Sequence, residues 1–267
     1  MQHESVQSRF GTTQLATGLE VHYAEQGDPS GEPIIFLHGY SDSWYSFSRV
    51  LPLLPPTYHA YAFDQRGHGN SGRPTCCYTM NDLANDVVAF MDALGIAEAT
   101  IAGHSMGSFI AQGVALSHPQ RVKRLMLIGS ATTAVNEGIT ELHDFVKTLD
   151  DPVPSEFVED FQKSTIYHEV PKEFLETIVS ESLKLPARVW KDALSGLMEC
   201  NYADQLHQLT MPTLIFWGTE DTIFFREEQD QLAALIPQAT LKIYSDTGHA
   251  LHWERPQQFA QDLRTFL

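Results

Sequence analysis

Cysteine is scarce in this chain, which has three in 267 residues, at Cys76, Cys77 and Cys200. Small domains held together by disulfides carry many cysteines at regular spacings, and structural zinc sites use pairs such as C-x-x-C. Neither pattern is present, because two of the cysteines are neighbours and the third is far away. We therefore expect three free thiols and a fold that depends on its hydrophobic core.

Long apolar runs and basic residues are also in short supply. No segment reaches the roughly 18 consecutive apolar residues of a membrane-spanning helix, and residues 1–10 lack the basic and apolar regions of a signal peptide. Seventeen basic residues against 34 acidic ones leave a formal charge of −17, which repels nucleic-acid phosphates and anionic lipids. We expect a soluble, cytoplasmic protein without nucleic-acid partners or membrane insertion, either a monomer or a homodimer.

Short apolar runs alternate with helical patterns along most of the chain, and its composition, 43% hydrophobic and 19% charged, is typical of a globular protein. Residues 7–14 and 18–26 predict a hairpin. Buried strands are expected at 34–37, 60–63, 99–102, 125–128, 213–217 and 241–244, and amphipathic helices at 81–94, 106–117 and 256–267. This alternation predicts an α/β fold, a mostly parallel, doubly wound sheet of about eight strands with helices on both faces.

Residues 134–209 break this alternation, because they contain several amphipathic helical patterns and no convincing strand. Apolar spacing predicts four helices here, and Pro171 and Pro186 stand where the third and fourth begin. The segment has no flexible linker at either end. We expect one core domain, residues 1–133 and 210–267, interrupted by a helical lid at 134–209 that packs against it.

A candidate nucleophile lies in Gly103-His104-Ser105-Met106-Gly107, a G-x-S-x-G sequence between the strand expected at 99–102 and the helix expected at 106–117. The pattern alone is common, but its place between a strand and a helix is informative. A sharp turn there holds the serine in a strained conformation, for which Gly103 and Gly107 leave room. Because open parallel sheets bind ligands at the carboxyl ends of their strands, Ser105 is predicted to face a binding crevice.

A serine hydroxyl is a weak nucleophile at neutral pH, so it needs a base with a pKa near 7 and a group that orients this base. Among twelve histidines, His249 is the best candidate, because it follows the last expected strand, 241–244, in a short loop at the same edge of the sheet. His252 is the nearest alternative.

Asp221 is the candidate orienting acid, since it follows the strand expected at 213–217 and is preferred to Glu220. The order along the chain is then serine, aspartate, histidine. An alternative role for Asp221 is the N-cap of a helix expected at 223–235.

Hydrolysis by a serine nucleophile also needs N–H groups that stabilise the oxyanion of the tetrahedral intermediate. Met106, directly after the nucleophile, supplies one candidate donor. The loop at 38–41 supplies the other, because Gly39 lets the backbone approach closely and the N–H of Tyr40 can point inward.

Together these motifs resemble the α/β-hydrolase superfamily over nearly the full chain. The matching segments are His38-Gly39, residues 64–71 (Asp-Gln-Arg-Gly-His-Gly-Asn-Ser), residues 103–107, residues 218–221, and Gly248-His249 with Glu254 and Pro256. Lidded esterases, lactonases, carbon–carbon hydrolases and haloperoxidase-like members that need no cofactor are nearest in pattern. The resemblance implies a triad of Ser105, Asp221 and His249, oxyanion donors at Tyr40 and Met106, and mainly structural roles for Asp64 and Arg66.

The expected reaction is therefore hydrolysis of small to medium, mainly apolar carboxylic esters through an acyl-enzyme, with no metal or organic cofactor. Alternatives are hydrolysis of a lactone or of a carbon–carbon bond, or a slow-turnover ligand receptor of the same fold. Apolar side chains of the lid are candidates for the substrate pocket: Phe145, Phe161, Trp190 and Met198. Serine at position 105 argues against dehalogenases and epoxide hydrolases, which carry aspartate there.

Overall fold

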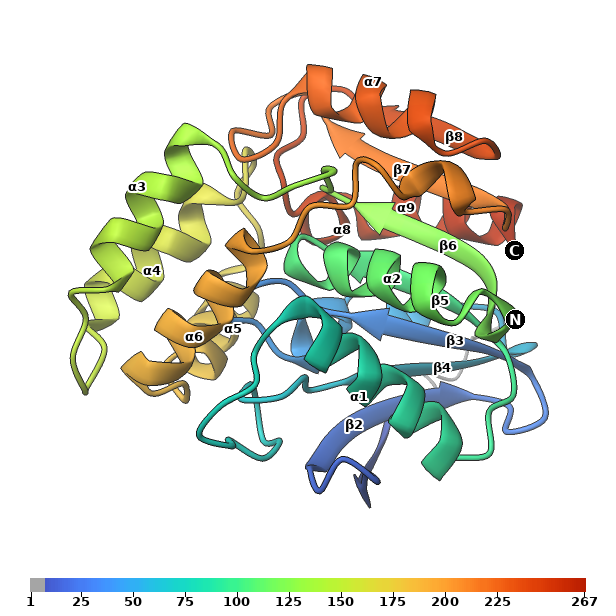
Figure 1. The fold of residues 1–267 in the computed structure, drawn as a ribbon, viewed down its shortest axis with the longest axis horizontal. Coiled ribbons are helices and arrows are strands. Elements are labelled where there is room, and N and C mark those ends of the chain that lie inside the picture. Colours follow the sequence, from blue (N-terminus) through green and yellow to red (C-terminus); the bar gives the residue numbers. More distant parts are fainter. Residues whose placement is uncertain (1–7) are drawn as a thin grey trace.

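The computed structural model describes residues 8–267, which fold around one eight-stranded sheet (Figure 1). The strands are β1 (Arg9–Gln14), β2 (Glu20–Gly27), β3 (Glu32–Leu37), β4 (Tyr58–Phe63), β5 (Ala99–His104), β6 (Val122–Ile128), β7 (Thr213–Gly218) and β8 (Ala239–Tyr244). Their order across the sheet is β1-β2-β4-β3-β5-β6-β7-β8. The β1–β2 and β2–β4 pairs are antiparallel and the other pairs are parallel, which confirms the expected mostly parallel sheet.

Every expected strand is present, and most begin one to three residues earlier than their apolar runs. The sequence pattern detects the buried part of a strand, whereas hydrogen bonding continues into its polar end. In β6, Lys123 and Arg124 precede the apolar run and form ion pairs with Glu32 of β3 at 2.7 and 2.6 Å. The first residue of the expected hairpin, Gln7, lies outside the described residues.

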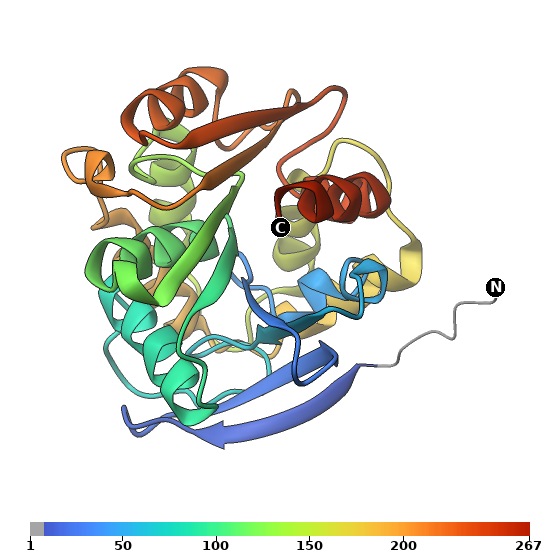
Figure 2. The same cartoon turned by 90° about the vertical axis from the view of Figure 1, so that its right-hand side faces the viewer.

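Helices cover both faces of the sheet, and α1 (Met80–Ala93), α2 (Met106–Ser117) and α7 (Arg226–Leu235) lie on the face opposite α9 (Pro256–Phe266) (Figure 2). Neighbouring residues of β3 point to different faces. Ile35 and Leu37 belong to the hydrophobic cluster beneath α1 and α2, whereas Ile34 and Phe36 belong to the cluster beneath α9. The central strands are therefore buried on both sides, which explains their uninterrupted apolar runs.

The bounds of α1 follow from local chemistry at both ends. At the start, the Thr79 hydroxyl accepts from the N–H of Asp82 at 3.2 Å, and the Asp82 carboxylate accepts from the N–H of Thr79 at 3.0 Å. At the end, Gly95 has a φ of 69°, a conformation that glycine adopts readily after a helix. This helix matches its expected range to within one residue.

Four helices separate β6 from β7, in the segment where four were expected: α3 (Glu137–Val146), α4 (Ser155–Ser164), α5 (Lys172–Ser182) and α6 (Ala187–Met198). In Figure 1 they lie together beyond the arrowheads of β6 and β7, at the carboxyl ends of the strands. No helix within residues 8–267 is long and apolar enough to cross a membrane.

The expectation of three free thiols is wrong for one pair, because Cys76 and Cys77 are joined in a disulfide. Both residues are exposed, in the turn that leads to α1, where Cys77 has a φ of 74°. Spacing rules describe disulfides that close loops between distant residues, and so they overlook a bond between neighbours. Cys200 is free and buried, as expected.

Asp64 and Arg66 both make buried structural contacts, Asp64 with backbone N–H groups and Arg66 with a side chain of α1. The Asp64 carboxylate accepts from the N–H of Trp44 at 2.7 Å and from the N–H of Asn70 at 2.9 Å. Arg66 forms two hydrogen bonds with Asp86 of α1, at 2.7 and 2.8 Å. These contacts agree with the structural roles that the resemblance implies.

Replacing Asp86 with alanine is expected to destabilise the fold by about 3 to 5 kcal/mol, because it leaves the Arg66 guanidinium largely buried without its partner. Asp92 on the same helix is the matched control, since its carboxylate is 63% exposed and pairs with Arg121 at the surface. Asp92→Ala is expected to cost less than about 1 kcal/mol. Equilibrium urea unfolding measures both values, and equal costs would contradict the assignment.

Candidate active site

Ser105 lies in a strained turn between β5 and α2, with φ 51° and ψ −120°. Glycine packing makes this turn possible. A Cβ atom on Gly103 would lie 2.1 Å from the carbonyl oxygen of Gly107, and one on Gly107 would lie 2.2 Å from the carbonyl oxygen of Leu37. Any side chain at either position would push α2 away from the sheet, so both glycines are required for this geometry.

His249 and Asp221 come together from the loops after β8 and β7. The Nδ1 atom of His249 lies 2.8 Å from Oδ2 of Asp221, and both side chains are almost fully buried. The other oxygen, Oδ1, accepts from the N–H groups of Ile223 and Phe224 at 2.8 and 3.0 Å. The Asp221 carboxylate thus orients the imidazole of His249 and also stabilises the turn at residues 221–224.

The alternative role of Asp221 as a helix N-cap is therefore only partly realised. Helix α7 begins at Arg226, three residues later than the expected start at 223, and Asp221 caps the turn that precedes it. With the Nδ1 proton directed at the carboxylate, the second ring nitrogen of His249 is left as an acceptor. Within residues 8–267 this Nε2 atom has no hydrogen-bond partner, and His249 lines the same cavity as Ser105.

The loop that carries His249 is held by Glu254. Its carboxylate accepts from the N–H of Gly248 at 2.8 Å, from Tyr167 at 3.1 Å and from His168 at 3.0 Å. A Cβ atom on Gly248 would lie 2.7 Å from the amide nitrogen of Tyr167. The histidine loop is thus fixed against the segment between α4 and α5.

His252, the alternative base, has a different environment. Its ring is fully buried, stacks on Phe47 with 4.8 Å between ring centroids, and places Nε2 3.1 Å from the hydroxyl oxygen of Ser46. Burial lowers the pKa of His252 to about 3. A group with that pKa is a poor proton acceptor at neutral pH, so the geometry favours His249.

Two backbone amides are available next to Ser105. Met106 is the first residue of α2, and Tyr40 follows β3 in the loop that passes the serine. Within the described residues, neither N–H has a backbone acceptor. The Tyr40 hydroxyl donates to the carbonyl oxygen of Trp190 in α6 at 2.6 Å, which ties this loop to the helical segment.

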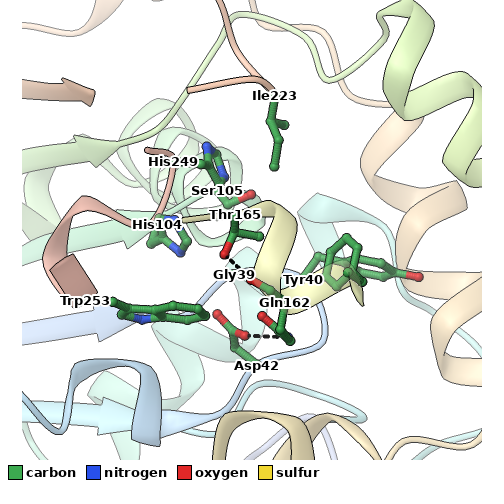
Figure 3. Close-up of a pocket in the computed structure, with 11 residues that line it drawn as sticks. Gly39, Tyr40, Asp42, His104, Ser105, Gln162, Thr165, Ile223, His249 and Trp253 are labelled. Atoms are coloured by element: carbon green, nitrogen blue, oxygen red, sulfur yellow. Dashed lines mark hydrogen bonds between the residues drawn. The ribbon is translucent and has the colours of Figure 1, made fainter. Parts of the chain in front are cut away.

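Ser105 opens into a small, narrow cavity, hereafter the Ser105 cavity (Figure 3). The residues that line it are Gly39, Tyr40, Asp42, His104, Ser105, Phe161, Gln162, Thr165, Ile223, His249 and Trp253. Aromatic and aliphatic side chains form part of the wall, and neither lysine nor arginine lines it. A lining that combines apolar side chains with polar groups is typical of small-molecule sites.

A second, more open hollow lies between α3 and α4 and has about 860 Å³ of empty space. This α3–α4 groove is lined by Leu142, Phe145, Pro154, Glu156, Phe157, Asp160, Phe161 and Ser164. Phe161 belongs to both linings, so its ring stands between the Ser105 cavity and the groove. The two charged side chains of the groove, Glu156 and Asp160, are both acidic.

The four candidate pocket residues have different positions. Phe161 lines the Ser105 cavity and Phe145 lines the α3–α4 groove. Trp190 is fully buried against Tyr40 and lines neither hollow, and Met198 packs against the main hydrophobic cluster. Periodicity identifies which side chains a helix buries, but it does not distinguish those that face a cavity from those that face the core.

Sequence reasoning missed several cavity residues. Asp42 and Gln162 line the Ser105 cavity, as do Ile223 and Trp253. Asp42 had a usable signal, because it lies two residues beyond Tyr40 in the loop expected to supply an oxyanion donor. Ile223 and Trp253 also lie beside quoted motifs, two residues after Asp221 and one before Glu254. Gln162 has no motif near it, so only the tertiary structure reveals it.

A parallel sheet with a strained serine between strand and helix, followed along the chain by a paired aspartate and histidine, is the arrangement typical of the α/β-hydrolase fold. A family model described as alpha/beta hydrolase fold matches residues 32–256. The chain therefore belongs to the α/β-hydrolase family and is a hydrolase of that family.

Relatives in this family cover almost the whole chain. A 2-hydroxy-6-oxononadienedioate/2-hydroxy-6-oxononatrienedioate hydrolase of Pseudomonas putida is 29% identical over 99% of this chain and 97% of its own length. Lipase 3 of a Moraxella species is 28% identical, covering 94% of this chain and 82% of its own. The crystal structure of a thermophilic esterase from Thermogutta terrifontis superposes with a TM-score of 0.82 at 25% identity, covering 97% of each chain.

The strain at Ser105 predicts a difference between two variants that both lack the hydroxyl. Ser105→Gly is expected to be more stable than Ser105→Ala by about 1 kcal/mol, because glycine adopts positive φ without the 1 to 3 kcal/mol that a strained residue costs, and this gain exceeds its greater loss of chain entropy. Thermal unfolding of both variants measures the difference. An alanine variant as stable as the glycine variant would mean that Ser105 is not strained.

Proposed function

We propose that this chain is a serine hydrolase that cleaves small to medium, mainly apolar carboxylic esters through an acyl-enzyme. Ser105 is the nucleophile, His249 the base and Asp221 the group that orients it. The observation that carries the proposal is the 2.8 Å contact between His249 and Asp221, beside a strained serine in one shared cavity. The family relatives include lipases and esterases, which supports ester chemistry.

In the first step, Nε2 of His249 takes the proton of Ser105 as the serine oxygen attacks the ester carbonyl. Asp221 holds the ring so that Nδ1 keeps its proton, and it stabilises the imidazolium that forms. The N–H groups of Tyr40 and Met106 donate to the new oxyanion, and losing one such donor typically costs about 3 to 4 kcal/mol of transition-state stabilisation. His249 then gives its proton to the departing alcohol.

In the second step, water attacks the acyl-enzyme. His249 removes a proton from the water, the tetrahedral intermediate forms again in the same oxyanion pocket, and Ser105 leaves with the proton returned by the imidazolium. The products are a carboxylic acid and a free serine. Every proton transfer uses the one imidazole, so no further acid or base is needed.

Residues 134–209 act as a lid in this proposal, with the α/β-hydrolase core formed by residues 1–133 and 210–267. Helix α4 supplies Phe161 and Gln162 to the Ser105 cavity, and α6 holds Tyr40 through Trp190. The lid therefore completes the substrate pocket and excludes water around the reacting carbonyl. The small size of the Ser105 cavity favours substrates with short acyl groups.

Charge distinguishes this chain from its relatives named 2-hydroxy-6-oxononadienedioate/2-hydroxy-6-oxononatrienedioate hydrolases, whose names give dicarboxylates as substrates. A buried carboxylate of a substrate needs a cationic partner. Neither lysine nor arginine lines the Ser105 cavity or the α3–α4 groove, and Asp42, Glu156 and Asp160 add negative charge. This favours neutral esters over a dienedioate. Lactones are neutral and remain compatible, and a slow-turnover receptor would release product in near-stoichiometric amounts.

Hydrolysis of p-nitrophenyl esters of increasing acyl length tests the proposal. The native protein is expected to turn over repeatedly, while Ser105→Ala and His249→Ala lose about four to six orders of magnitude in kcat, because each removes a member of one catalytic unit. Ser117→Ala, exposed at the end of α2, is the control and retains native activity. A native protein that is inert across the series, or a single-turnover burst, would reject the esterase assignment.

The position of Phe161 predicts how acyl length is limited. Native protein is expected to prefer two- to four-carbon acyl groups, because the phenyl ring closes the Ser105 cavity. Phe161→Ala removes this wall and joins the cavity to the α3–α4 groove, so the optimum in kcat/KM is expected to move to longer chains. Phe145→Ala changes only the far end of the groove and is the matched control for short esters. An unchanged optimum in Phe161→Ala would show that the groove does not receive substrate.

A further inference from the structure

A buried carboxyl group, that of Asp42, faces the Ser105 cavity without a cationic partner among residues 8–267. Only 2% of Asp42 is exposed. Its Oδ1 accepts from Nε2 of Gln162 at 3.1 Å, and its Oδ2 accepts from the hydroxyl of Ser46 at a long 3.3 Å. The backbone of Gly39 makes a third contact with this carboxyl group. An ionised carboxyl group has about four acceptor positions, so one is left for a ligand. The proposed ester hydrolysis assigns no role to this group.

Gln162 of α4 lies beside Asp42 and is fully buried (Figure 3). Its neighbours determine which way the amide is oriented. Nε2 faces the Asp42 carboxyl group and the hydroxyl oxygen of Ser182 at 2.9 Å, and Ser182 has already donated its own proton to the carbonyl of Ile178. Ser182 therefore requires a donor, which fixes Nε2 on this side and leaves Oε1 on the other side of the amide. Within the described part of the chain, this oxygen has no partner.

These groups lie next to the loop that passes the reacting serine. A Cβ atom built on Gly39 would lie 3.2 Å from Oδ2 of Asp42 and 2.9 Å from Nδ1 of His104. His104 lines the cavity too. One of its ring nitrogens faces the backbone of His249, and within residues 8–267 neither nitrogen forms a hydrogen bond of normal geometry. Gly39 directly precedes Tyr40, the proposed oxyanion donor. A substrate group that reached these atoms would be only a few bonds from the scissile carbonyl.

The polar atoms of Asp42, Gln162 and His104 that lack partners can be satisfied by a small group that both donates and accepts hydrogen bonds. Burial lowers the pKa of His104, so its ring is neutral and offers one N–H donor and one acceptor. Burial also raises the pKa of Asp42 to about 7, so its carboxyl group exists in both protonation states near neutral pH. A hydroxyl group pairs with either state, whereas an ammonium group would require the ionised form in an otherwise uncharged cavity.

We propose that Asp42, Gln162 and His104 form a recognition subsite that binds a hydroxyl group on the acyl chain of the substrate, close to the scissile carbonyl. The subsite selects hydroxyacyl esters, such as 3-hydroxyacyl esters, over the corresponding plain esters. This inference rests on the proposed ester hydrolysis for its position relative to the reaction. The binding of the hydroxyl group itself depends only on the cavity.

A purely structural role is the alternative that the test must exclude. Gln162 also contacts the Ser41 hydroxyl oxygen at 3.1 Å, so the Asp42–Gln162 pair ties α4 to the loop after β3. If this tie were its only role, changing Asp42 would weaken the reaction of every ester by the same factor. A recognition role changes the ratio between two esters that differ by one hydroxyl group.

The kinetic test compares p-nitrophenyl 3-hydroxybutyrate with p-nitrophenyl butyrate. Native protein is expected to prefer the hydroxyacyl ester by about tenfold in kcat/KM, the value of roughly one net hydrogen bond. Asp42→Leu, which has no polar atoms, is expected to lose this preference. Asp42→Asn has an amide that can pair with a hydroxyl group, and this variant is expected to retain much of the preference for the hydroxyacyl ester. Equal preference in native protein and Asp42→Leu would overturn the inference.

A binding test separates failure of this inference from failure of the esterase assignment. Ser105→Ala is expected to bind methyl 3-hydroxybutyrate about tenfold more tightly than methyl butyrate in a calorimetric or NMR titration, and Ser105→Ala/Asp42→Leu is expected to bind both equally. This difference does not require turnover. If p-nitrophenyl esters are not hydrolysed but the difference in binding is present, the esterase assignment fails and the subsite stands. If hydrolysis occurs without either preference, the subsite is rejected and the esterase assignment stands.

Discussion

The close approach of α2 to the carboxyl ends of β3 and β5 is the constraint on which the rest of the site depends. Gly103 and Gly107 allow it, since any Cβ atom there would collide with the backbone. This approach forces Ser105 to positive φ and lifts its side chain above the sheet edge. Met106, the first residue of α2, directly follows this serine, so one packing contact positions both the proposed nucleophile and one proposed oxyanion donor. The strain is retained because the eight-stranded sheet fixes both neighbours.

Three separate hydrogen-bonded contacts tie the helical segment to the loops of the core. Tyr40 donates to the carbonyl of Trp190, Glu254 accepts from the backbone after α4, and Gln162 donates to Asp42. Each contact involves a loop that carries a proposed catalytic or recognition group. Movement of the helical segment would therefore disturb the Tyr40 loop, the His249 loop and the proposed recognition subsite together. Such coupling makes pocket closure and catalytic geometry parts of one arrangement.

The sequence was sufficient for features that depend on local chemistry. Apolar runs and one alternating hairpin pattern located the strands, and Ser105, His249 and Asp221 were singled out because each follows a strand at the same sheet edge. Features that depend on how distant segments pack were not accessible. Gln162 carries no motif, and nothing in its neighbourhood along the chain reveals that it meets Asp42, 120 residues earlier. Phe161 and Trp190 look alike as apolar residues of amphipathic helices, yet only Phe161 lines the Ser105 cavity.

Charge gives the proposed reaction a direction. An ester substrate enters neutral, but hydrolysis converts its acyl part into a carboxylic acid that ionises in water. Neither lysine nor arginine lines the Ser105 cavity to retain the carboxylate, while Asp42 within it and the −17 formal charge of the chain repel it. The same electrostatic field that leaves a neutral substrate unaffected therefore favours release of the product. A cationic side chain in the wall would bind dicarboxylates but would also hold each acid product, so a wall without lysine or arginine suits the turnover of neutral esters.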